Sequence, residues 1–130
     1  MRSFYFFKTP RLIQQVFKNY RWSFYSSKKV IYLTFDDGPT AEITEWTLNI
    51  LKEFDAKATF FCIGKNVENH PKIFSQIISG QHSVGNHTNN HLNGWKSATI
   101  TYVKNIEKAA HSIQSSNSKL LFRPPYGKIK

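Results

Sequence analysis

The sequence contains a single cysteine, no long apolar run and few acidic residues. Because Cys62 is the only cysteine in the sequence, an intrachain disulfide framework and a zinc site made only of cysteines are excluded. No apolar run approaches the roughly 20 residues that a membrane-spanning helix needs, so we expect no transmembrane segment. The 130 residues suit one domain with one core, and 40% hydrophobic and 20% charged residues indicate a globular chain.

Acidic residues are absent from the first 35 positions. The chain has 18 Lys and Arg against 8 Asp and Glu, and seven of these cations precede Asp36. Nine aromatic residues lie among them, from Phe4 to Tyr25. This mixture occurs on surfaces that meet nucleic acids, membranes or anionic polymers, and also on ordinary solvated surfaces. No nucleic-acid recognition motif accompanies it, so we expect no nucleic-acid partner.

Residues 1–27 are predicted to form a basic, aromatic N-terminal extension. The apolar stretch 4–7 is too short for a secretory signal, which needs roughly 7–15 apolar residues, and no signal peptide is recognised. Thr9-Pro10 is typical of a helix start. A short amphipathic helix should follow, with an apolar face of Leu12, Ile13, Val16, Phe17 and Tyr20.

This helix has two interpretations. A basic amphipathic helix makes weak contact with an anionic membrane surface, which would fit a membrane-peripheral protein. Alternatively, its apolar face packs against the domain that follows, which fits a cytoplasmic protein equally well.

From residue 28 onward, strand-like and helix-like segments alternate. Strands are predicted over residues 30–35, 58–63, near 83–85, and 120–122. Helices are predicted after Thr40, from Pro71 to Gly80 and from Thr99 to about Ser115. The residues expected to face the core are Ile43, Thr47, Ile50, Leu51 and Phe54, then Ile73, Phe74, Ile77 and Ile78, and finally Val103, Ile106, Ala110 and Ile113. Repeated strand–helix units predict an α/β fold with a parallel sheet covered by helices.

Polar side chains directly follow three of the predicted strands. Asp36 and Asp37 come after the first, His87 and His91 after the third, and Arg123 after the last. The carboxyl ends of parallel strands lie at one edge of a sheet, where sites are usually built. We therefore expect these five side chains to share one rim.

His87 and His91 form an H-x-x-x-H pair, whose imidazoles would face the same way on a helical turn. The spacing alone often arises by chance, but Asp37 can add a carboxylate ligand. Two nitrogens and one oxygen leave coordination positions open, as in a catalytic metal site. Non-haem iron oxygenases use the same ligand types. Surface or capping roles are expected for the remaining histidines, His70, His82 and His111.

The adjacent aspartates also have two interpretations. In one, Asp36-Asp37-Gly38-Pro39 is a turn whose carboxylates accept backbone hydrogen bonds. In the other, Asp36 ends a buried strand, where an unpaired carboxylate is costly, and Arg123 supplies its partner. An exposed Asp36–Arg123 ion pair would stabilise the fold little.

Three motifs stand in order along the chain: TFDDGP at 34–39, GNHTNNH at 85–91 and RPPYG at 123–127. Together they resemble the first three motifs of the polysaccharide deacetylase family, the fourth family of carbohydrate esterases, whose members share a chitooligosaccharide-deacetylase-type domain. The segment 58–61 is similar to the family's linking segment. The resemblance implies that residues 28–130 form the N-terminal part of a distorted (β/α) barrel, truncated before its last strands.

The resemblance also implies an activity. Family members are hydrolases that act on carbon–nitrogen bonds other than peptide bonds, and remove N-acetyl or O-acetyl groups from a polysaccharide or oligosaccharide. They use a divalent metal ion, often zinc. By resemblance, the metal ligands are Asp37, His87 and His91, the catalytic base is Asp36, Arg123 orients that base, and the backbone N–H of Tyr126 stabilises the oxyanion.

The family pattern continues beyond the third motif. One later motif contributes an Asp and a Trp that line one wall of the site. Another contributes the histidine that protonates the leaving amine. No matched position of this chain supplies that histidine, so we expect a C-terminally incomplete domain with weak deacetylation on its own. The alternatives are a non-catalytic saccharide-binding remnant of the same fold and a basic nucleic-acid-binding module.

Overall fold

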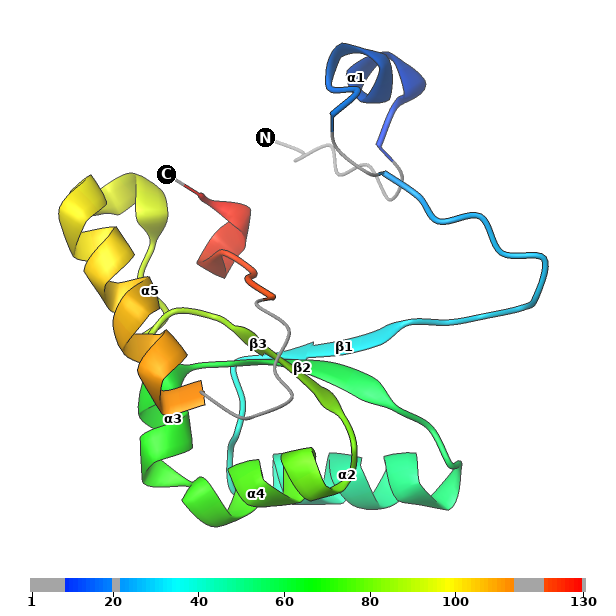
Figure 1. The fold of residues 1–130 in the computed structure, drawn as a ribbon, viewed down its shortest axis with the longest axis vertical. Coiled ribbons are helices and arrows are strands. Elements are labelled where there is room, and N and C mark those ends of the chain that lie inside the picture. The colour runs from blue at the N-terminus through cyan, green and yellow to red at the C-terminus, as the bar shows by residue number, and fades with distance from the viewer. Residues whose placement is uncertain (1–8, 20–21, 114–120, 130) are drawn as a thin grey trace, which may run out of the picture. The chain divides into compact units, whose positions relative to one another are not determined.

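The computed structural model describes residues 9–19, 22–113 and 121–129 (Figure 1). Contacts divide the chain into two units, Met1–Ile31 and Tyr32–Lys130. The first unit contains helix α1 (Arg11–Val16), which is shorter than the sequence predicts and has Pro10 as its N-cap rather than in its first turn. Of the predicted apolar face, Tyr20 lies outside the described residues. No helix in the described part of the chain has the length and apolar content to span a membrane.

The second unit is built on a parallel sheet in the order β1-β2-β3, formed by Leu33–Asp36, Ala58–Cys62 and Ser83–Asn86. Phe35 pairs with Phe60, and Phe60 pairs with Val84, so equivalent positions of the three strands lie side by side. The helices are α2 (Ile43–Glu53), α3 (Gly64–Asn69), α4 (Pro71–Ser79) and α5 (Thr99–Ile113), with short 3-10 turns η1 (Gly94–Lys96) and η2 (Pro125–Gly127). The predicted α/β class with a parallel sheet is confirmed.

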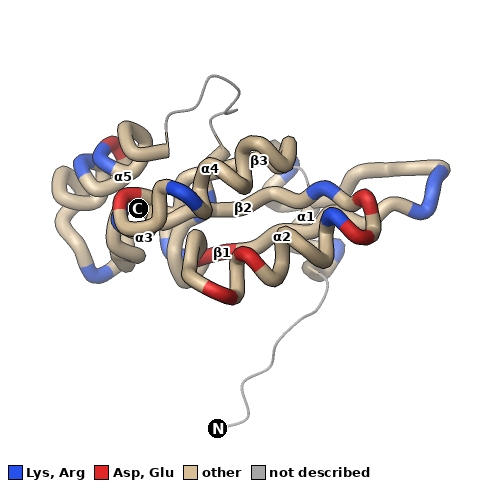
Figure 2. The backbone as a smooth tube through the Cα atoms, turned by 90° about the horizontal axis from the view of Figure 1, so that it is seen from below, with Lys and Arg blue, Asp and Glu red and all other residues tan. Residues whose placement is uncertain are grey.

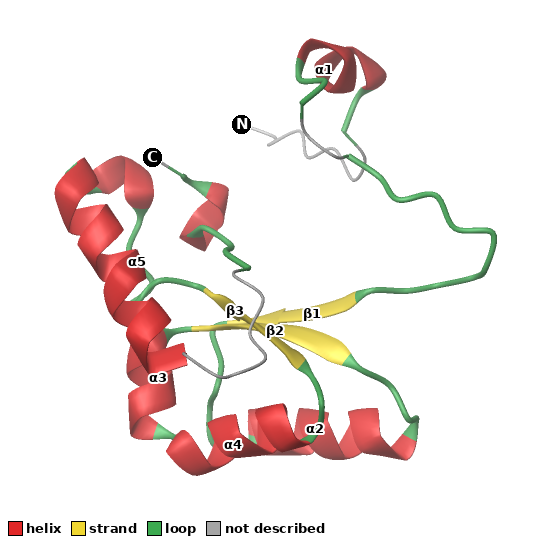
Figure 3. Cartoon of the chain, in the orientation of Figure 1, coloured by secondary structure: helices red, strands yellow, loops and turns green. Residues whose placement is uncertain are grey.

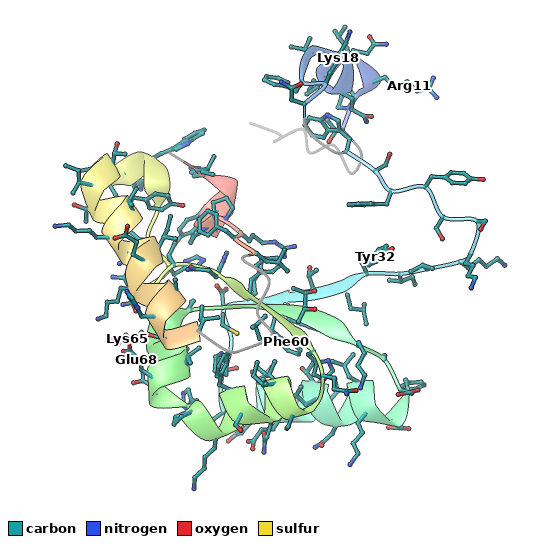
Figure 4. All side chains as sticks on the ribbon, in the orientation of Figure 1. Arg11, Lys18, Tyr32, Phe60, Lys65 and Glu68 are labelled. Carbon is teal, nitrogen blue, oxygen red and sulfur yellow. The ribbon has the colours of Figure 1, made fainter. Side chains whose placement is uncertain are left out.

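Helices α2 and α4 lie along one face of the sheet, and α3 and α5 pack against each other (Figure 3). The core lies between these helices and β2, and Figure 4 shows Phe60 on the side of the sheet that faces α2 and α4. Its buried residues are Leu51, Ala58, Phe60, Cys62, Val67, Ile77, Val84, Ala109 and Ile113. Because apolar burial drives folding, the alternating apolar residues of β2 and the inward face of α4 determine this arrangement.

Two strand predictions need correction. The first strand begins at Leu33 instead of Val30 and is largely exposed, so the expectation of a buried strand is wrong. Among the described residues β1 pairs only with β2, which leaves one of its edges and much of its surface to solvent. Of the predicted strand 120–122, residue 120 lies outside the described residues, and Phe122 forms an isolated parallel bridge to Asn86.

The buried faces of α2 and α5 agree only in part with the predictions. α2 begins at Ile43 rather than near Thr40. Of its predicted face, Leu51 is buried as expected, whereas Ile43, Ile50 and Phe54 are exposed, and Thr44 is buried without having been predicted. α5 buries Ile113 as predicted. At two other positions it buries the preceding residue, Tyr102 instead of Val103 and Ala109 instead of Ala110. One residue corresponds to a rotation of about 100° about a helix axis. In contrast, α4 has the predicted inward face, whereas α3 is a helix that the sequence analysis did not predict.

Cys62 lies on the central strand, is fully buried, and its burial raises the pKa of the thiol to about 12. Because the thiolate is the reactive species, we expect thiol reagents to label the folded chain at least about 100-fold more slowly than the denatured chain near neutral pH. Labelling can be followed spectroscopically with and without guanidinium chloride.

The matched positive control is Ser79→Cys, which places a thiol on the exposed end of α4. That variant should react quickly with one equivalent of reagent in the folded state. Equally fast labelling of the parent chain would contradict the buried, inert cysteine.

Candidate metal centre

The candidate metal centre forms where β1 and β3 end. His87 Nε2 lies 3.4 Å and His91 Nε2 3.2 Å from Asp37 Oδ1, and the three potential ligand atoms lie within 4.8 Å of one another. The predicted convergence of these three side chains at one rim is therefore present in the structure. The chemistry of the donors, two imidazole nitrogens and one carboxylate oxygen, fits a divalent metal ion such as zinc.

The two histidines do not lie on the helical turn that their spacing suggests. Residues 87–93 form an irregular loop after β3, in which Thr88 and His91 have left-handed backbones with φ of 64° and 57°. The loop bends back at these positions, so the rings approach each other with their centroids 5.1 Å apart. The rings converge without a helical turn, because the loop's backbone hydrogen bonds go to neighbouring segments rather than along a helix.

Backbone hydrogen bonds tie this loop to the end of β2 and the start of α3. His87 N–H donates to the Cys62 carbonyl over 2.9 Å. Gly64 N–H donates to the Thr88 carbonyl over 3.0 Å, and Lys65 N–H donates to the Asn89 carbonyl over 2.9 Å. The first amides of α3, which have no acceptor within their own helix, thus satisfy the carbonyls of the loop.

Side-chain amides and a hydroxyl complete the support of the loop. Asn86 accepts a hydrogen bond from Thr88 N–H with its Oδ1 and donates its Nδ2 to the Ile106 carbonyl of α5, each over 2.8 Å. Thr88 Oγ1 accepts from Leu92 N–H over 3.0 Å. Asn105 Oδ1 accepts from Asn89 N–H over 2.8 Å. These supporting roles of Asn86, Thr88 and Asn105 are not among the sequence predictions, although a run of polar residues directly after a buried strand is a signal for them.

The hydrogen bonds of His87 favour metal binding through Nε2. Its Nδ1 lies 2.6 Å from the Arg123 carbonyl oxygen, which can only accept, so Nδ1 carries the proton. The lone pair of Nε2 is then available on the side that faces Asp37. His87 is buried, which holds this ring in place, whereas the His91 side chain is about one quarter exposed, at 28%.

Asp37 is held by its backbone. It has a φ of 68°, in the left-handed region that Asp tolerates better than most residues. Its carbonyl accepts a hydrogen bond from Asn66 Nδ2 of α3 over 2.7 Å, and the carbonyl of Gly38 accepts one from Ile63 N–H over 2.9 Å. These bonds fix the turn while the carboxylate stays 60% exposed and open to a ligand.

Arg123 forms the predicted pair with Asp36. Its Nη1 lies 2.7 Å from Asp36 Oδ1 and 3.0 Å from Thr34 Oγ1, and its guanidinium carbon lies 4.0 Å above the centre of the Phe61 ring. Asp36 is not buried as expected, because its side chain is 38% exposed on the open edge of the sheet. The pair therefore orients the Asp36 carboxylate, and its contribution to stability is small.

Tyr126 lies beside the histidines, in η2. Its ring packs edge-on against the His91 ring with centroids 4.6 Å apart, and its φ is 58°. All six predicted site residues are thus near one end of the sheet: Asp36, Asp37, His87, His91, Arg123 and Tyr126.

The remaining histidines lie elsewhere, as the sequence analysis expects. His82 Nδ1 accepts a hydrogen bond from Ala58 N–H over 3.3 Å at the opposite end of the sheet. Desolvation, with a smaller effect of the Lys57 charge, lowers the pKa of this histidine. His70 is the N-cap residue of α4, and His111 is exposed in the last turn of α5.

Comparisons with known proteins show which family this chain resembles. Residues 25–130 match the family described as polysaccharide deacetylase. A peptidoglycan-N-acetylglucosamine deacetylase of Bacillus cereus is 37% identical over 109 residues, which are 83% of this chain and 51% of the relative. A chitooligosaccharide deacetylase of Azorhizobium caulinodans is 38% identical over 100 residues, 75% of this chain and 48% of the relative.

A solved structure shares the fold. The crystal structure of a peptidoglycan N-acetylglucosamine deacetylase has a TM-score of 0.76 and 38% identity, and the match covers 80% of this chain and 50% of that one. The chain spans about half the length of these relatives.

Gly64, at the start of α3, has no room for a side chain. A Cβ there would lie 2.8 Å from both the Ala109 Cα and Asn89 Oδ1, which forces α3 away from α5 and from the loop. We expect Gly64→Ala to lower the free energy of unfolding by about 1–3 kcal/mol in urea titrations. Because the Gly64 amide holds the Thr88 carbonyl, the same variant should bind zinc more weakly in calorimetric titrations.

Gly38→Ala is the matched control, since a Cβ at Gly38 would meet Thr44 Oγ1 at an ordinary 3.6 Å. Its unfolding free energy should stay within about 1 kcal/mol of the parent. Equal losses in the two variants would show that the tight contact at Gly64 is not what holds the loop.

Proposed function

The chain belongs to the polysaccharide deacetylase family, and on that premise we propose that it is a metal-dependent hydrolase that removes N-acetyl groups from a saccharide polymer. The observation that carries the proposal is the convergence of Asp37, His87 and His91, with the Asp36–Arg123 pair on the same rim. We also propose that residues 28–130 form the deacetylase domain and that residues 1–27 are an extension outside it.

Asp37, His87 and His91 would hold the metal ion. Zinc fits two nitrogens and one oxygen, a set that leaves positions for water and substrate. When bound, such an ion lowers the pKa of water and polarises a carbonyl group, which an unreactive amide requires. The Arg123 carbonyl supports this role because it keeps the proton of His87 on Nδ1.

Asp36 would act as the general base. Its Oδ1 accepts the hydrogen bond from Arg123, so the second carboxylate oxygen remains to take a proton from the attacking water. Arg123 is itself fixed by Thr34 and by the Phe61 ring, which limits the positions that the carboxylate can adopt. A base that is oriented before the reaction loses little entropy in the transition state.

Tyr126 would contribute to stabilisation of the tetrahedral oxyanion through its backbone N–H. The left-handed conformation of this residue and the contact of its ring with His91 support that role. One well-placed donor of this kind is worth on the order of 3 kcal/mol in the transition state.

The substrate proposed is an oligomer or polymer that contains N-acetylated hexosamines. Relatives of the chain are named for peptidoglycan and for chitooligosaccharides, which share that sugar class. O-acetyl groups are a second substrate type for the same chemistry, because an ester is more reactive than an amide.

Zinc binding and acetate release together test the proposal. The parent should bind one zinc ion per chain, and His91→Ala should weaken zinc binding by more than about 100-fold, since a ligand matters more than its supporting residues. Asp36→Asn should keep zinc binding while acetate release from N-acetylglucosamine oligomers falls about 10²–10⁴-fold. Calorimetry and an enzyme-coupled acetate assay provide the two readouts.

Asp55→Asn serves as the control, because Asp55 is exposed after α2, away from the site. It should match the parent in both measurements. Because weak acetate release is expected from this chain alone, the decisive comparison is a chain extended with the family's later motifs. Zinc and oligosaccharide binding without any acetate release by that extended chain would contradict a hydrolase and favour the non-catalytic saccharide-binding alternative.

A further inference from the structure

Two hydrogen bonds join the turns at the amino-terminal edge of the sheet, opposite the candidate metal centre. Lys57 and Ala58 stand where β2 begins, and Gly80 and His82 stand just before β3. Lys57 Nζ donates to the Gly80 carbonyl over 3.0 Å, and Ala58 N–H donates to His82 Nδ1 over 3.3 Å. The turn between α2 and β2 is thus attached to the turn between α4 and β3 at two neighbouring positions.

The His82 ring fits closely between its neighbours. A Cβ at Gly80 would lie 3.0 Å from both Cδ2 and Nε2 of the imidazole. The ring also packs edge-on against Phe60, a core residue, with centroids 5.4 Å apart. Because the pairing of β2 with β3 begins only at Thr59, the imidazole binds the Ala58 N–H just outside the paired residues. A side chain therefore closes this end of the strand pair.

The hydrogen bond from Ala58 requires a neutral imidazole. Nδ1 accepts, so it has a free lone pair, and the single proton of the neutral ring is on Nε2. When the ring takes a second proton, Nδ1 becomes a donor that faces the donor of Ala58. The new charge also has the same sign as the Lys57 ammonium, which acts on this ring. Protonation of His82 therefore removes one of the two hydrogen bonds and opposes the other.

Water reaches His82 through a cavity of about 490 Å³ between α2 and α4. Among the described residues, the charged groups that line it are Glu45 and Lys52 of α2 and Asp55 and Lys57 of the following turn, while α4 adds only uncharged side chains. Two acidic and two basic groups balance, so burial of the ring is the larger influence. Burial, followed by the charge of Lys57, lowers the pKa of His82 from its ordinary value of 6.5.

We propose that His82 is a pH-sensitive switch, which holds the two turns together while its imidazole is neutral and separates them when the imidazole is protonated. Separation opens the amino-terminal end of the β2–β3 pair and exposes the edge of the Phe60 ring to the cavity. Because the folded chain disfavours the imidazolium, the closed form is complete above the unfolded pKa of 6.5 and is lost as the pH falls through the lower pKa of the folded chain. The switch does not depend on the proposed hydrolase activity.

The experiment measures hydrogen exchange of the Ala58 amide by NMR from about pH 7.5 to about pH 5, with each rate divided by that of an unstructured peptide at the same pH. In the parent, protection should fall by up to about tenfold per pH unit below 6.5, because opening is coupled to the uptake of one proton. His82→Gln keeps an acceptor but cannot take a proton, so its protection should be independent of pH. His111→Gln, which replaces an exposed histidine on α5, is the matched control and should behave like the parent.

The Ile63 amide, which donates to the Gly38 carbonyl at the other end of β2, is the internal reference. Its protection should fall less steeply than that of Ala58, because the opening is local. Protection of Ala58 that does not change with pH, the same change in His82→Gln, or an equal fall at Ile63 in the parent would each overturn the switch. If His82→Gln does not fold, the comparison of Ala58 with Ile63 in the parent decides the question.

Discussion

Two backbone hydrogen bonds at the start of α3, from Gly64 N–H to the Thr88 carbonyl and from Lys65 N–H to the Asn89 carbonyl, fix the loop that carries both histidines. They form because β2 and β3 are parallel and in register, so the chain that leaves β2 passes directly beside the chain that leaves β3. Without these hydrogen bonds, the left-handed backbone conformations of Thr88 and His91 would not be stabilised. The positions of the proposed metal ligands thus depend on the order of the strands more than on the spacing of these residues in the sequence.

Arg123 connects the two halves of the proposed chemistry. Its side chain orients Asp36, while its backbone carbonyl sets the protonated nitrogen of His87. Its own N–H donates to the Asn86 carbonyl, which attaches the segment to the end of β3. The proposed base and one proposed metal ligand are therefore positioned by the same residue through different atoms, so the side-chain role can change while the backbone role stays.

The location of the candidate site could be predicted from the sequence because its carboxylate, imidazole and guanidinium side chains directly follow predicted strands. Asp37, His87 and Arg123 each follow a strand-like segment. In a parallel sheet the carboxyl ends of all strands lie at the same edge, so residues that follow the strands lie together there. The buried face of α2 was harder to predict from the sequence. Besides the predicted stripe, α2 carries Trp46 and Leu48, so apolar residues point in most directions and periodicity alone cannot choose the face that meets the sheet. The conformation of the loop from His87 to His91 could not be predicted from the residue pattern either, because it depends on hydrogen-bond donors and acceptors that are distant in the sequence.

The exposed apolar side chains of α2 and the open edge of β1 have a consequence for colloidal behaviour. Leu33, Ile43, Trp46 and Phe54 face solvent in the described structure, and Figure 2 shows basic residues spread over many elements instead of one patch. With a net charge of +10, copies of the chain repel one another at low ionic strength. Salt shortens the range of that repulsion to about 8–10 Å, so the chain's solubility should decrease as ionic strength rises, while apolar attraction between copies is undiminished.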